Sequence, residues 1–504
     1  GIEGETGEVG PEGPEGPQGE VGPQGEEADP VDYEILTNMV ASDSTFLDNM
    51  NSSNSAIGFG SMTDLSAFDK AYDMFNAQMT GTYIFHALNI HTDQDNNVYV
   101  IGSYMTDSEN YIDEFQLYYN SNGSGYETYF IAKYDSTGII KNVISAEANN
   151  INNLQFFYTS SLVDDYGNIF IGGRIKTSGG KHEVFVRKYN ASDLTLLDEQ
   201  LSVSSSDGGH SSNSVWDIVS DGFGGAYIGG VYSHSIELSS YTLQADNSNF
   251  SQGFVFKWNN NGTVSWANHI GDIGLANAND FASSIVVDQN TDILLAGLRS
   301  SEDYASYHVF IKKYNSIGQL ITTVESDSIN YGPTIDMGVK VNVDNYNNIY
   351  LYTTHYLILT DPNFVFNSHV LPPMYSHSEI LYKMDSNFSL MNAINFGSGT
   401  TKAKKIIVLS NDDVILSKGT NDEVCIINNI NYEQDVKQEG RVIHLDDNND
   451  FVKFHSLGNS IGNTIGASIT ANNNYIYSLY FRQGSFTNNN NIYPSGYYVV
   501  KESY

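Results

Sequence analysis

Short runs of alternating apolar and polar residues recur along the chain from residue 86 onward, separated by turns rich in Asp, Asn and Gly. Strict alternation predicts a half-buried β-strand, and such turns favour tight hairpins. Seven times, a strand runs into an acidic or Asn/Gly turn and is followed by a second strand that ends in small residues. The equivalent turn residues lie 56 to 71 positions apart, and they are Asn97, Asn168, Gly225, Asp292, Asn348, Asp413 and Asn474.

Each unit has a second half, made of a strand, a tight turn and an edge strand. Residues 130–134, 254–258 and 310–314 are clear examples, and their alternation predicts a lysine that faces outward. Four strands in each of seven units predict an all-β fold, a seven-bladed β-propeller. The last three units are the weaker ones, so a ring of six or eight blades would require that one of them be misassigned.

The two ends of the repeat complement each other. The last unit stops at its third strand, residues 497–504, whereas residues 72–77 precede the first unit and resemble an edge strand. We therefore expect the N-terminal strand to complete the last blade, which would leave no open sheet edge. On this prediction the propeller domain spans residues 68–504.

The start of the chain follows a different period. Glycine occupies every third position from Gly1 to Gly25, which is the pattern of a collagen triple helix, because only glycine fits on its crowded axis. Residues 1–27 are thus predicted to form a triple-helical stem, and the chain a homotrimer. Proline follows glycine directly and never precedes it, in which the stem resembles bacterial, phage and giant-virus collagens. Its acidic character and nine triplets lead us to expect a longer stem before Gly1.

Residues 28–50 are predicted to form a short helical neck. Asp29 and Pro30 suit a helix start, and apolar residues at Ile35, Met39 and Phe46 recur at helical spacing. The apolar stripe could pack on the head within one chain. Beside a triple helix, we expect it to pack on its two symmetry mates and to set the register of the trimer. Residues 51–67, rich in Ser, Asn and Gly, are interpreted as a linker.

The head units resemble a bacterial beta-propeller repeat family, whose strands read D-x-x-G-N-x-Y-V-x-G and then F-V-x-K-Y. Residues 166–173 and 254–258 carry the likeness, which is good in the first four units and weak in the rest. The resemblance implies a propeller fold and an extracellular setting. It offers no catalytic residues to transfer.

Composition narrows the function. A formal net charge of −37 argues against nucleic acid and anionic membranes as partners. A single cysteine, Cys425, rules out an internal disulfide framework, and its apolar neighbours indicate a buried, inert thiol. No apolar run has the length of a transmembrane helix. The twelve histidines form no metal-binding or catalytic spacing.

Two acidic turns have the oxygen density of a calcium loop. They contain Asp93 and Asp95 in one case and Asp446, Asp447 and Asp450 in the other. Neither has the Gly and terminal Glu of an EF-hand, and tight hairpins need Asp and Asn in any case. Calcium is therefore one interpretation of these turns and hairpin chemistry is the other. No other cofactor is expected.

Long insertions between the second and third strands, residues 105–127, 233–252, 353–377 and 483–494, all open on one face of a propeller. Aromatic side chains set among polar ones suit a carbohydrate or protein ligand. These residues could instead cover the head or contact a neighbouring subunit. The candidate ligand-binding residues are Tyr111, Phe115, Tyr118, Tyr119, Tyr241, Phe364, Phe366, Tyr375 and Tyr493.

The sequence thus predicts a homotrimeric, extracellular surface fibre of a cell, virion or filament, whose propeller heads act in adhesion or in receptor or glycan binding. One alternative is a structural unit of an extracellular filament or sheath. Another is a propeller-type polysaccharide hydrolase or lyase, although no catalytic motif is found and an enzyme is not expected.

Overall fold

The computed structural model divides the chain into two compact units, residues 1–55 and 56–504. The described residues all belong to the second unit, so the predicted stem and neck lie outside them. No helix in the described part of the chain is long and apolar enough to cross a membrane. The described residues are 62–63, 72–77, 79–80, 86–105, 111–112, 114–118, 127–146, 155–177, 181–204, 213–245, 251–271, 279–300, 306–327, 329–330, 339–356, 365–366, 369–370, 377–396, 403–419, 424–427, 430–433, 440–448, 450–455, 464–472, 475–482, 486–488, 491–493 and 496–503.

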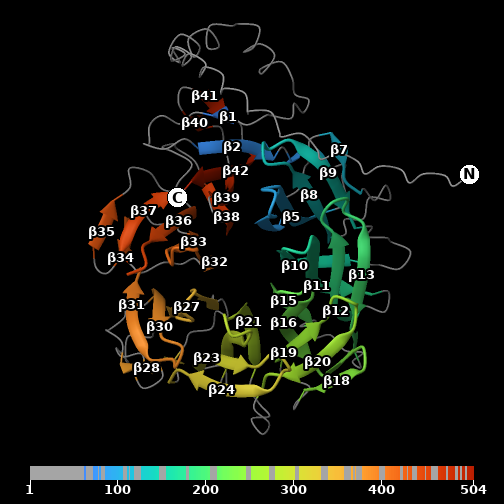
Figure 1. The fold of residues 1–504 in the computed structure, drawn as a ribbon, viewed down its shortest axis with the longest axis vertical. Helices are drawn as coiled ribbons and strands as arrows, with labels where there is room; N and C mark the ends of the chain where they lie inside the picture. Colours follow the sequence, from blue (N-terminus) through green and yellow to red (C-terminus); the bar gives the residue numbers. More distant parts are fainter. Residues whose placement is uncertain are drawn as a thin grey trace, which may run out of the picture. The chain divides into compact units, whose positions relative to one another are not determined.

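Seven antiparallel sheets form the blades of a β-propeller, which confirms the all-β, seven-bladed prediction (Figure 1). From the innermost strand outward, blades 1 to 3 are β4 (His86–Thr92), β5 (Val98–Met105), β8 (Glu127–Tyr134) and β9 (Ile140–Ser145); β10 (Gln155–Val163), β11 (Asn168–Lys176), β12 (His182–Asn190) and β13 (Leu196–Leu201); and β15 (Ser214–Ser220), β16 (Ala226–Ser233), β19 (Ser251–Trp258) and β20 (Val264–His269). Blades 4 to 6 are β21 (Asp280–Val287), β22 (Ile293–Ser300), β23 (Ser306–Tyr314) and β24 (Leu320–Glu325); β26 (Val339–Val343), β27 (Ile349–Tyr356), β30 (His377–Met384) and β31 (Leu390–Asn395); and β32 (Ala403–Val408), β33 (Val414–Gly419), β36 (Gly440–Leu445) and β37 (Phe451–His455).

The seventh blade joins the two ends of the propeller. It contains β38 (Thr464–Ala471), β39 (Tyr475–Arg482), β42 (Gly496–Ser503) and, as its fourth strand, β2 (Tyr72–Ala77). Tyr72 pairs with Glu502 and Ala77 with Tyr497 in an antiparallel ladder. β1 (Met62–Thr63) adds two residues on the outer side of β2. The innermost strands of neighbouring blades contact one another around the whole ring, from β4 through β10, β15, β21, β26 and β32 to β38 and back to β4.

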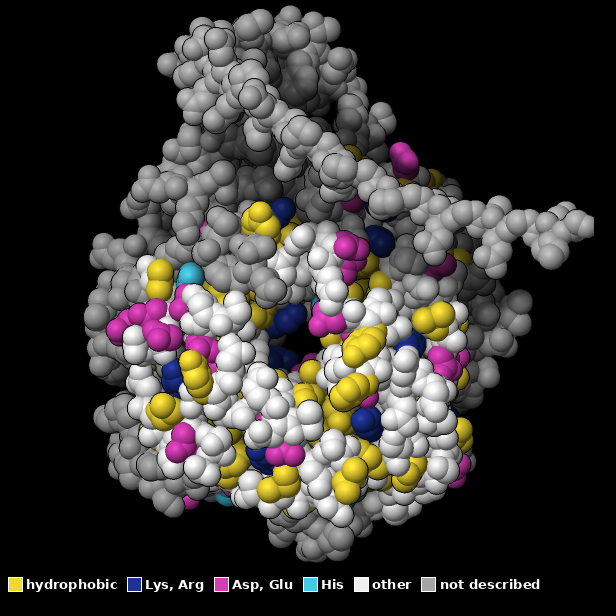
Figure 2. All heavy atoms as spheres, viewed as in Figure 1, with side chains coloured by type: hydrophobic (Ala, Val, Ile, Leu, Met, Phe, Trp, Pro, Cys, Tyr) yellow, Lys and Arg dark blue, Asp and Glu magenta, His cyan; other side chains and the backbone are white. Residues whose placement is uncertain are grey.

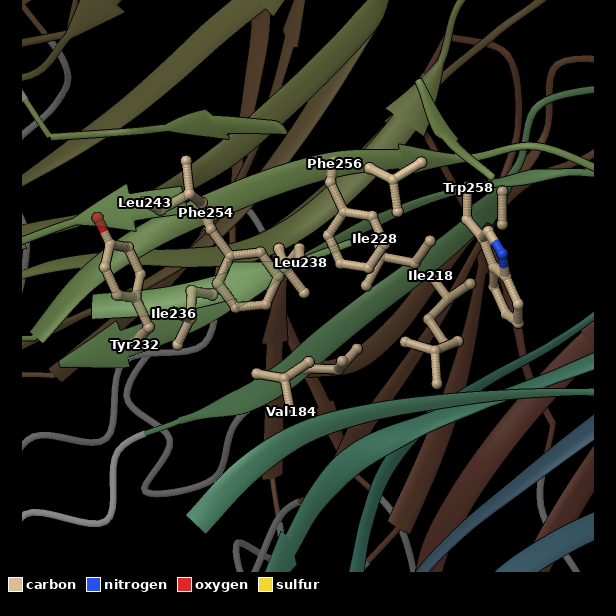
Figure 3. Packing of buried hydrophobic residues seen from close by; sticks show 14 of the residues in the cluster. Val184, Ile218, Ile228, Tyr232, Ile236, Leu238, Leu243, Phe254, Phe256 and Trp258 are labelled. Carbon is tan, nitrogen blue, oxygen red and sulfur yellow. The ribbon is translucent and has the colours of Figure 1, made fainter. Parts of the chain in front are cut away.

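The core consists of layers between neighbouring blades. Both faces of each second strand are covered, so β16 and β22 are buried along their entire length. This explains why these segments are near-continuously apolar and not alternating. In the layer between blades 2 and 3, Trp258 meets the edge of Phe170 at a centroid distance of 5.8 Å, close to Ile218 and Ile228 (Figure 3). Each blade therefore depends on both neighbours for burial of its apolar surface.

The turn between the first and second strands is fixed by an aspartate. In blade 2, Asp164 Oδ1 accepts hydrogen bonds from the backbone N–H groups of Tyr166 (2.9 Å) and Asn168 (2.7 Å). Its Oδ2 accepts from the Asn168 side-chain amide at 2.8 Å. These bonds satisfy N–H groups that the tight turn leaves without a ladder partner. The same backbone-capping role falls to Asp93, Asp221, Asp288 and Asp344.

The third-strand lysines do not face outward as the alternation predicted. Lys257 pairs in register with Tyr227 on the neighbouring strand, and its ammonium lies 5.2 Å from the centroid of that ring. The ammonium also lies 3.4 Å from an Asp221 carboxylate oxygen, and 18% of the Lys257 side chain is exposed. Equivalent lysine–tyrosine pairs are Lys133 with Tyr99, Lys383 with Tyr350 and Lys501 with Tyr477. The motif lysine thus joins two strands and a turn through cation–π and ionic contacts.

Glycines in the second strand make room for a bulge in the first. The innermost strands of blades 2, 3 and 4 carry a β-bulge near their start. There, a Cβ on Gly230 would lie 2.1 Å from the backbone oxygen of Ser214. The corresponding distance is 2.1 Å from Gly173 to the Phe157 oxygen and 2.0 Å from Gly297 to the Phe281 oxygen. The small residues that end these strands are therefore required by a backbone contact.

Gly230→Ala tests this contact. Because the atom it would meet is backbone, the two strands must separate, and we expect a loss of about 2–3 kcal/mol in the free energy of unfolding. Gly222→Ala is the matched control: its φ is +76° but nothing lies within 4 Å of the added carbon, so about 1 kcal/mol of backbone strain is expected. Urea unfolding followed by tryptophan fluorescence measures both. Equal losses would contradict the proposed role of the carbonyl contact.

Candidate functional site

The two faces of the propeller differ in their connections. In an antiparallel four-stranded blade, the turns between strands one and two and between strands three and four lie at one face, here termed the hairpin face. The connections between strands two and three and between blades lie at the other, here termed the loop face. The aspartate-capped turns occupy the hairpin face, whereas all the long insertions belong to the loop face.

Several insertions form small β-hairpins. In blade 1 these are β6 (Tyr111–Ile112) and β7 (Phe115–Gln116), which pair with β3 (Met79–Thr80). In blade 3 they are β17 (Ser235–Leu238) and β18 (Tyr241–Gln244), beside β14 (Val203–Ser204). Further hairpins are β28 (Val365–Phe366) with β29 (His369–Val370), β34 (Val424–Ile427) with β35 (Ile430–Glu433), and β40 (Phe486–Asn488) with β41 (Asn491–Tyr493).

The aromatic residues predicted to bind ligand lie on separate blades. Tyr111, Phe115 and Tyr118 are half-buried on the blade 1 insertion, where the backbone oxygen of Tyr118 accepts a hydrogen bond from Tyr104 Oη at 3.0 Å. Tyr241 donates a hydrogen bond to the backbone oxygen of Ser265. Phe366 is 4% exposed and stacks on Tyr382 in the layer between blades 4 and 5. Tyr119, Phe364 and Tyr375 lie outside the described residues, and Tyr493 ends β41. Among the residues that the structure describes, candidate aromatic residues from different blades are not brought together.

A different set of side chains lines a hollow of about 450 Å³ at the loop-face ends of blades 1 to 4. Trp216 and Phe281, from the innermost strands of blades 3 and 4, stack with an interplanar angle of 8° and a centroid distance of 5.5 Å. Trp216 is 37% exposed, so a flat apolar surface is open to solvent. Glu127, Phe157, Tyr158, Thr159, Arg174, Ser214, Val231 and Ser251 form the rest of the lining.

Arg174 contributes a positive charge to the lining of the hollow. Its guanidinium lies 4.4 Å from the centroid of Phe157, in a cation–π contact that orients the group. His182 stacks on the same ring at 5.8 Å. Burial lowers the pKa of His182, and the positive charges of Arg174 and Lys176 lower it further, so the imidazole is neutral at pH 7. Glu127 is the single carboxylate among the lining residues, and its Oε1 accepts a hydrogen bond from Ser103 Oγ at 2.9 Å.

The inner-strand bulges aim side chains into this hollow. Thr159 and Trp216 are the extra residues of the bulges in blades 2 and 3, each five positions before the capping aspartate. A bulge residue is left out of the ladder, and its side chain is turned away from the alternating pattern. Two positions earlier, Phe157 and Phe281 stand at equivalent places of blades 2 and 4. Alignment of the units on the residue that begins the first turn, an aspartate in five of them, would have drawn attention to these aromatics, which we did not predict.

The acidic turns proposed as calcium loops have their oxygens engaged in the fold. Asp93 Oδ1 accepts from the N–H groups of Asp95 and Asn97, and its Oδ2 accepts from Asn97 Nδ2 and Tyr99 Oη, at 2.8 to 3.0 Å. Asp446 Oδ1 accepts from the N–H groups of Asn448 and Asp450, and Asp447 Oδ1 from Asn448 Nδ2. Within the described ranges, no group of three or more His, Cys, Asp or Glu side chains is placed to hold a metal ion.

Comparisons with known proteins give no family. No family model matches the chain, and no curated protein matches it. Solved structures that match include a quinohemoprotein alcohol dehydrogenase from Pseudomonas putida (9% identity, 85% of this chain and 76% of that chain, TM-score 0.36). They also include the Trypanosoma rangeli sialidase in complex with sialic acid (10%, 89% and 57%, 0.37) and a Penicillium chrysogenum α-L-arabinanase complexed with arabinobiose (9%, 72% and 94%, 0.38). Such distant likenesses say nothing about activity, and the fold assignment stands on the strand pairing itself.

Asp93→Asn tests the hairpin interpretation of the acidic turns. The substitution places an NH₂ group against donors that now face carboxylate oxygens, so we expect a loss of about 1–3 kcal/mol in the free energy of unfolding. Calcium at millimolar concentration should shift the unfolding midpoints of the wild type and the variant equally. A calcium-dependent rise confined to the wild type would instead identify Asp93 as a metal ligand.

Proposed function

We propose that the chain is a homotrimeric fibre protein displayed on the outside of a cell, virion or filament, and that its propeller head binds a glycan or protein ligand through the loop-face hollow. The solvent-open Trp216–Phe281 stack carries the proposal. An exposed aromatic stack beside a fixed guanidinium offers both an apolar platform and a polar anchor, the combination that defines small-ligand sites.

The rigidity of the hollow supports binding. Its side chains project from strands of the blades themselves, and most of those strands are hydrogen-bonded on both sides or packed against the next blade. A site on such a frame needs little ordering when a ligand arrives, which favours affinity. One carboxylate among the lining residues suits binding better than glycoside hydrolysis, which generally requires a pair.

The stem supports a trimer. Nine consecutive Gly-X-Y triplets have no use in a single chain, because the triple helix needs three strands to exclude water from its axis. Three heads on one stem would present three copies of the hollow. Weak individual sites then add up to strong attachment through a raised effective concentration.

The hairpin face favours a second candidate function, assembly into a filament or sheath. Tyr166, Phe223 and Tyr346 occupy the same position of three aspartate-capped turns and are 57%, 67% and 77% exposed. Aromatic residues repeated at one level of a surface are suited to contact another protein. In this candidate, heads would associate through the hairpin face and leave the hollow free.

Trp216→Ala separates the two candidates. We expect it to reduce binding on a glycan array, or to a captured receptor, by at least about tenfold, because one face of the platform is lost. Phe223→Ala removes an exposed aromatic side chain from the hairpin face and serves as the control. Unchanged ligand binding in Trp216→Ala, together with loss of concentration-dependent polymerisation in Phe223→Ala, would favour the assembly role.

Gly16→Ala tests the trimeric stem. A methyl group on the axis disrupts a triple helix locally, so we expect a lower melting temperature of the stem and a shift from trimer to monomer in sedimentation velocity. Gln18→Ala, at a position whose side chain faces outward, should leave the mass unchanged. A monomeric wild-type chain would rule out the trimer while leaving the hollow to be tested separately.

A further inference from the structure

The innermost strands carry a ring of polar residues around the central channel. Four positions before the residue that begins the first turn, every blade has a polar or charged side chain. The seven, in blade order, are Asn89, Ser160, Asp217, Ser284, Lys340, Lys405 and Ser468. Because these strands pair on one side only, their free edges face the axis and need hydrogen-bond partners there.

In two blades, this side chain serves the next blade along the ring. Asp217 Oδ2 accepts from the backbone N–H of Ile285 at 2.9 Å, and Ser284 Oγ accepts from that of Val341 at 3.3 Å. Ile285 and Val341 are equivalent residues of blades 4 and 5. Blades 3 and 4 thus each lend an acceptor to the next blade.

Blades 5 and 6 differ from blades 3 and 4, because the side chains of Lys340 and Lys405 are hydrogen-bond donors and cannot act as acceptors. The backbone N–H that corresponds to Ile285 and Val341 in blade 6 belongs to Ile406, and Lys340 cannot accept from it. Lys340 Nζ makes one long contact of 3.5 Å, to the backbone oxygen of Ser283. Among the described residues, the Lys405 ammonium has no hydrogen-bond acceptor. Donors therefore gather on one side of the channel.

The charge at this level is not balanced. Asp217 is the nearby carboxylate, and both of its oxygens already accept backbone N–H bonds, from Ile218 at 3.0 Å and from Ile285. Burial, opposed by the negative charge of Asp217 and assisted by the positive charge of Lys340, lowers the pKa of Lys405 to about 8. His91, on the far side of the ring, is neutral because burial, with help from Lys405, lowers its pKa well below the usual value. Lys or Arg side chains are visible inside the central opening (Figure 2).

We propose that the central channel is a binding site for an oxyanion, a sulfate, phosphate or carboxylate group held between Lys340 and Lys405. The ligand would supply the acceptors that blades 5 and 6 lack and the negative charge that ammonium groups on two neighbouring inner strands require. The chain has a net charge of −37, so its overall field repels anions. A cationic pocket of this kind would therefore bind an oxyanion through its local contacts alone. The site is independent of the loop-face hollow and does not rest on its proposed function.

Isothermal titration of the full chain with sodium sulfate, against sodium chloride of equal ionic strength, tests the site. We expect saturable binding that weakens at least about tenfold in Lys405→Met and in Lys340→Met, since each removes a charged donor. Lys141→Met, which removes an outer-strand lysine paired with Asp135, should bind as the wild type does. Replacing a poorly compensated, half-buried charge with methionine should not unfold the protein.

The pH dependence distinguishes the lysine from a general salt effect. Sulfate affinity should fall as pH rises from about 7 to 9.5, because Lys405 loses its proton across this range, and Lys405→Arg should bind with little change over the same range. Lys340, Asp217 and His91 face the same space as Lys405. No saturable sulfate binding by the wild type, or equal binding by Lys405→Met, would overturn the proposal.

A second titration identifies the source of the oxyanion. A trisaccharide of hexuronic acid presents a carboxylate on a sugar that could also reach the hollow. If its binding falls in both Lys405→Met and Trp216→Ala, the channel receives the acidic group of a glycan. If the trisaccharide does not bind while sulfate does, the channel holds a free ion. Both results uphold the oxyanion site, and the second leaves the proposed glycan function to be judged by Trp216→Ala alone.

Discussion

Burial of both faces of every blade is the constraint on which the fold depends. A four-stranded sheet with one solvated face can be stable beside a single partner, but here the second strands are apolar on both sides and must be covered twice. No blade can satisfy this alone, and a row of blades would leave two uncovered ends. Ring closure follows, and β2 supplies the fourth strand of blade 7 from the opposite end of the propeller sequence. Tight turns, buried lysines and bulge-facing glycines each serve this close approach of sheets.

The proposed binding sites lie where this constraint is relaxed. The innermost strands have a free edge and bulges, so their side chains need not all enter the layers between blades. Trp216 leaves its ladder at a bulge and reaches the hollow, whereas Lys340 and Lys405 stand on innermost strands, beside the channel. The outer strands have no equivalent freedom on the loop face, where insertion hairpins such as β17 and β18 bury Ile236 and Leu238 and become part of the core. A rigid scaffold with specialised inner strands is therefore the arrangement that this sequence encodes.

Local chemistry made most of the head predictable. The turn residues and alternating strands specify hairpins, and the missing fourth strand of the last unit indicates the closing strand. Tertiary contacts account for the rest. Lys257 was expected in solvent because alternation shows only that successive side chains lie on opposite faces of a strand. It does not show that the face with Lys257 also carries an aromatic ring and a carboxylate that contact its ammonium group. Phe366 has the loop context of a binding residue but is drawn into the core by Tyr382. Conversely, Trp216 has the sequence context of a core residue, and only the bulge brings it to the surface.

The closing strand also has a mechanical meaning. β2 precedes blade 1 along the chain and, with β1 on its outer side, completes a blade whose other three strands come from the C-terminal end. In the proposed fibre, tension between an anchored stem and a bound head passes through Tyr72–Ala77 before it reaches blade 1. The two residue pairs of β1 with β2 and the six pairs of the β2–β42 ladder thus bear traction before blade 1 does, and rupture of the β2–β42 ladder would open the ring at one defined seam. The strand that completes the fold is therefore also the place where the fold would open under tension.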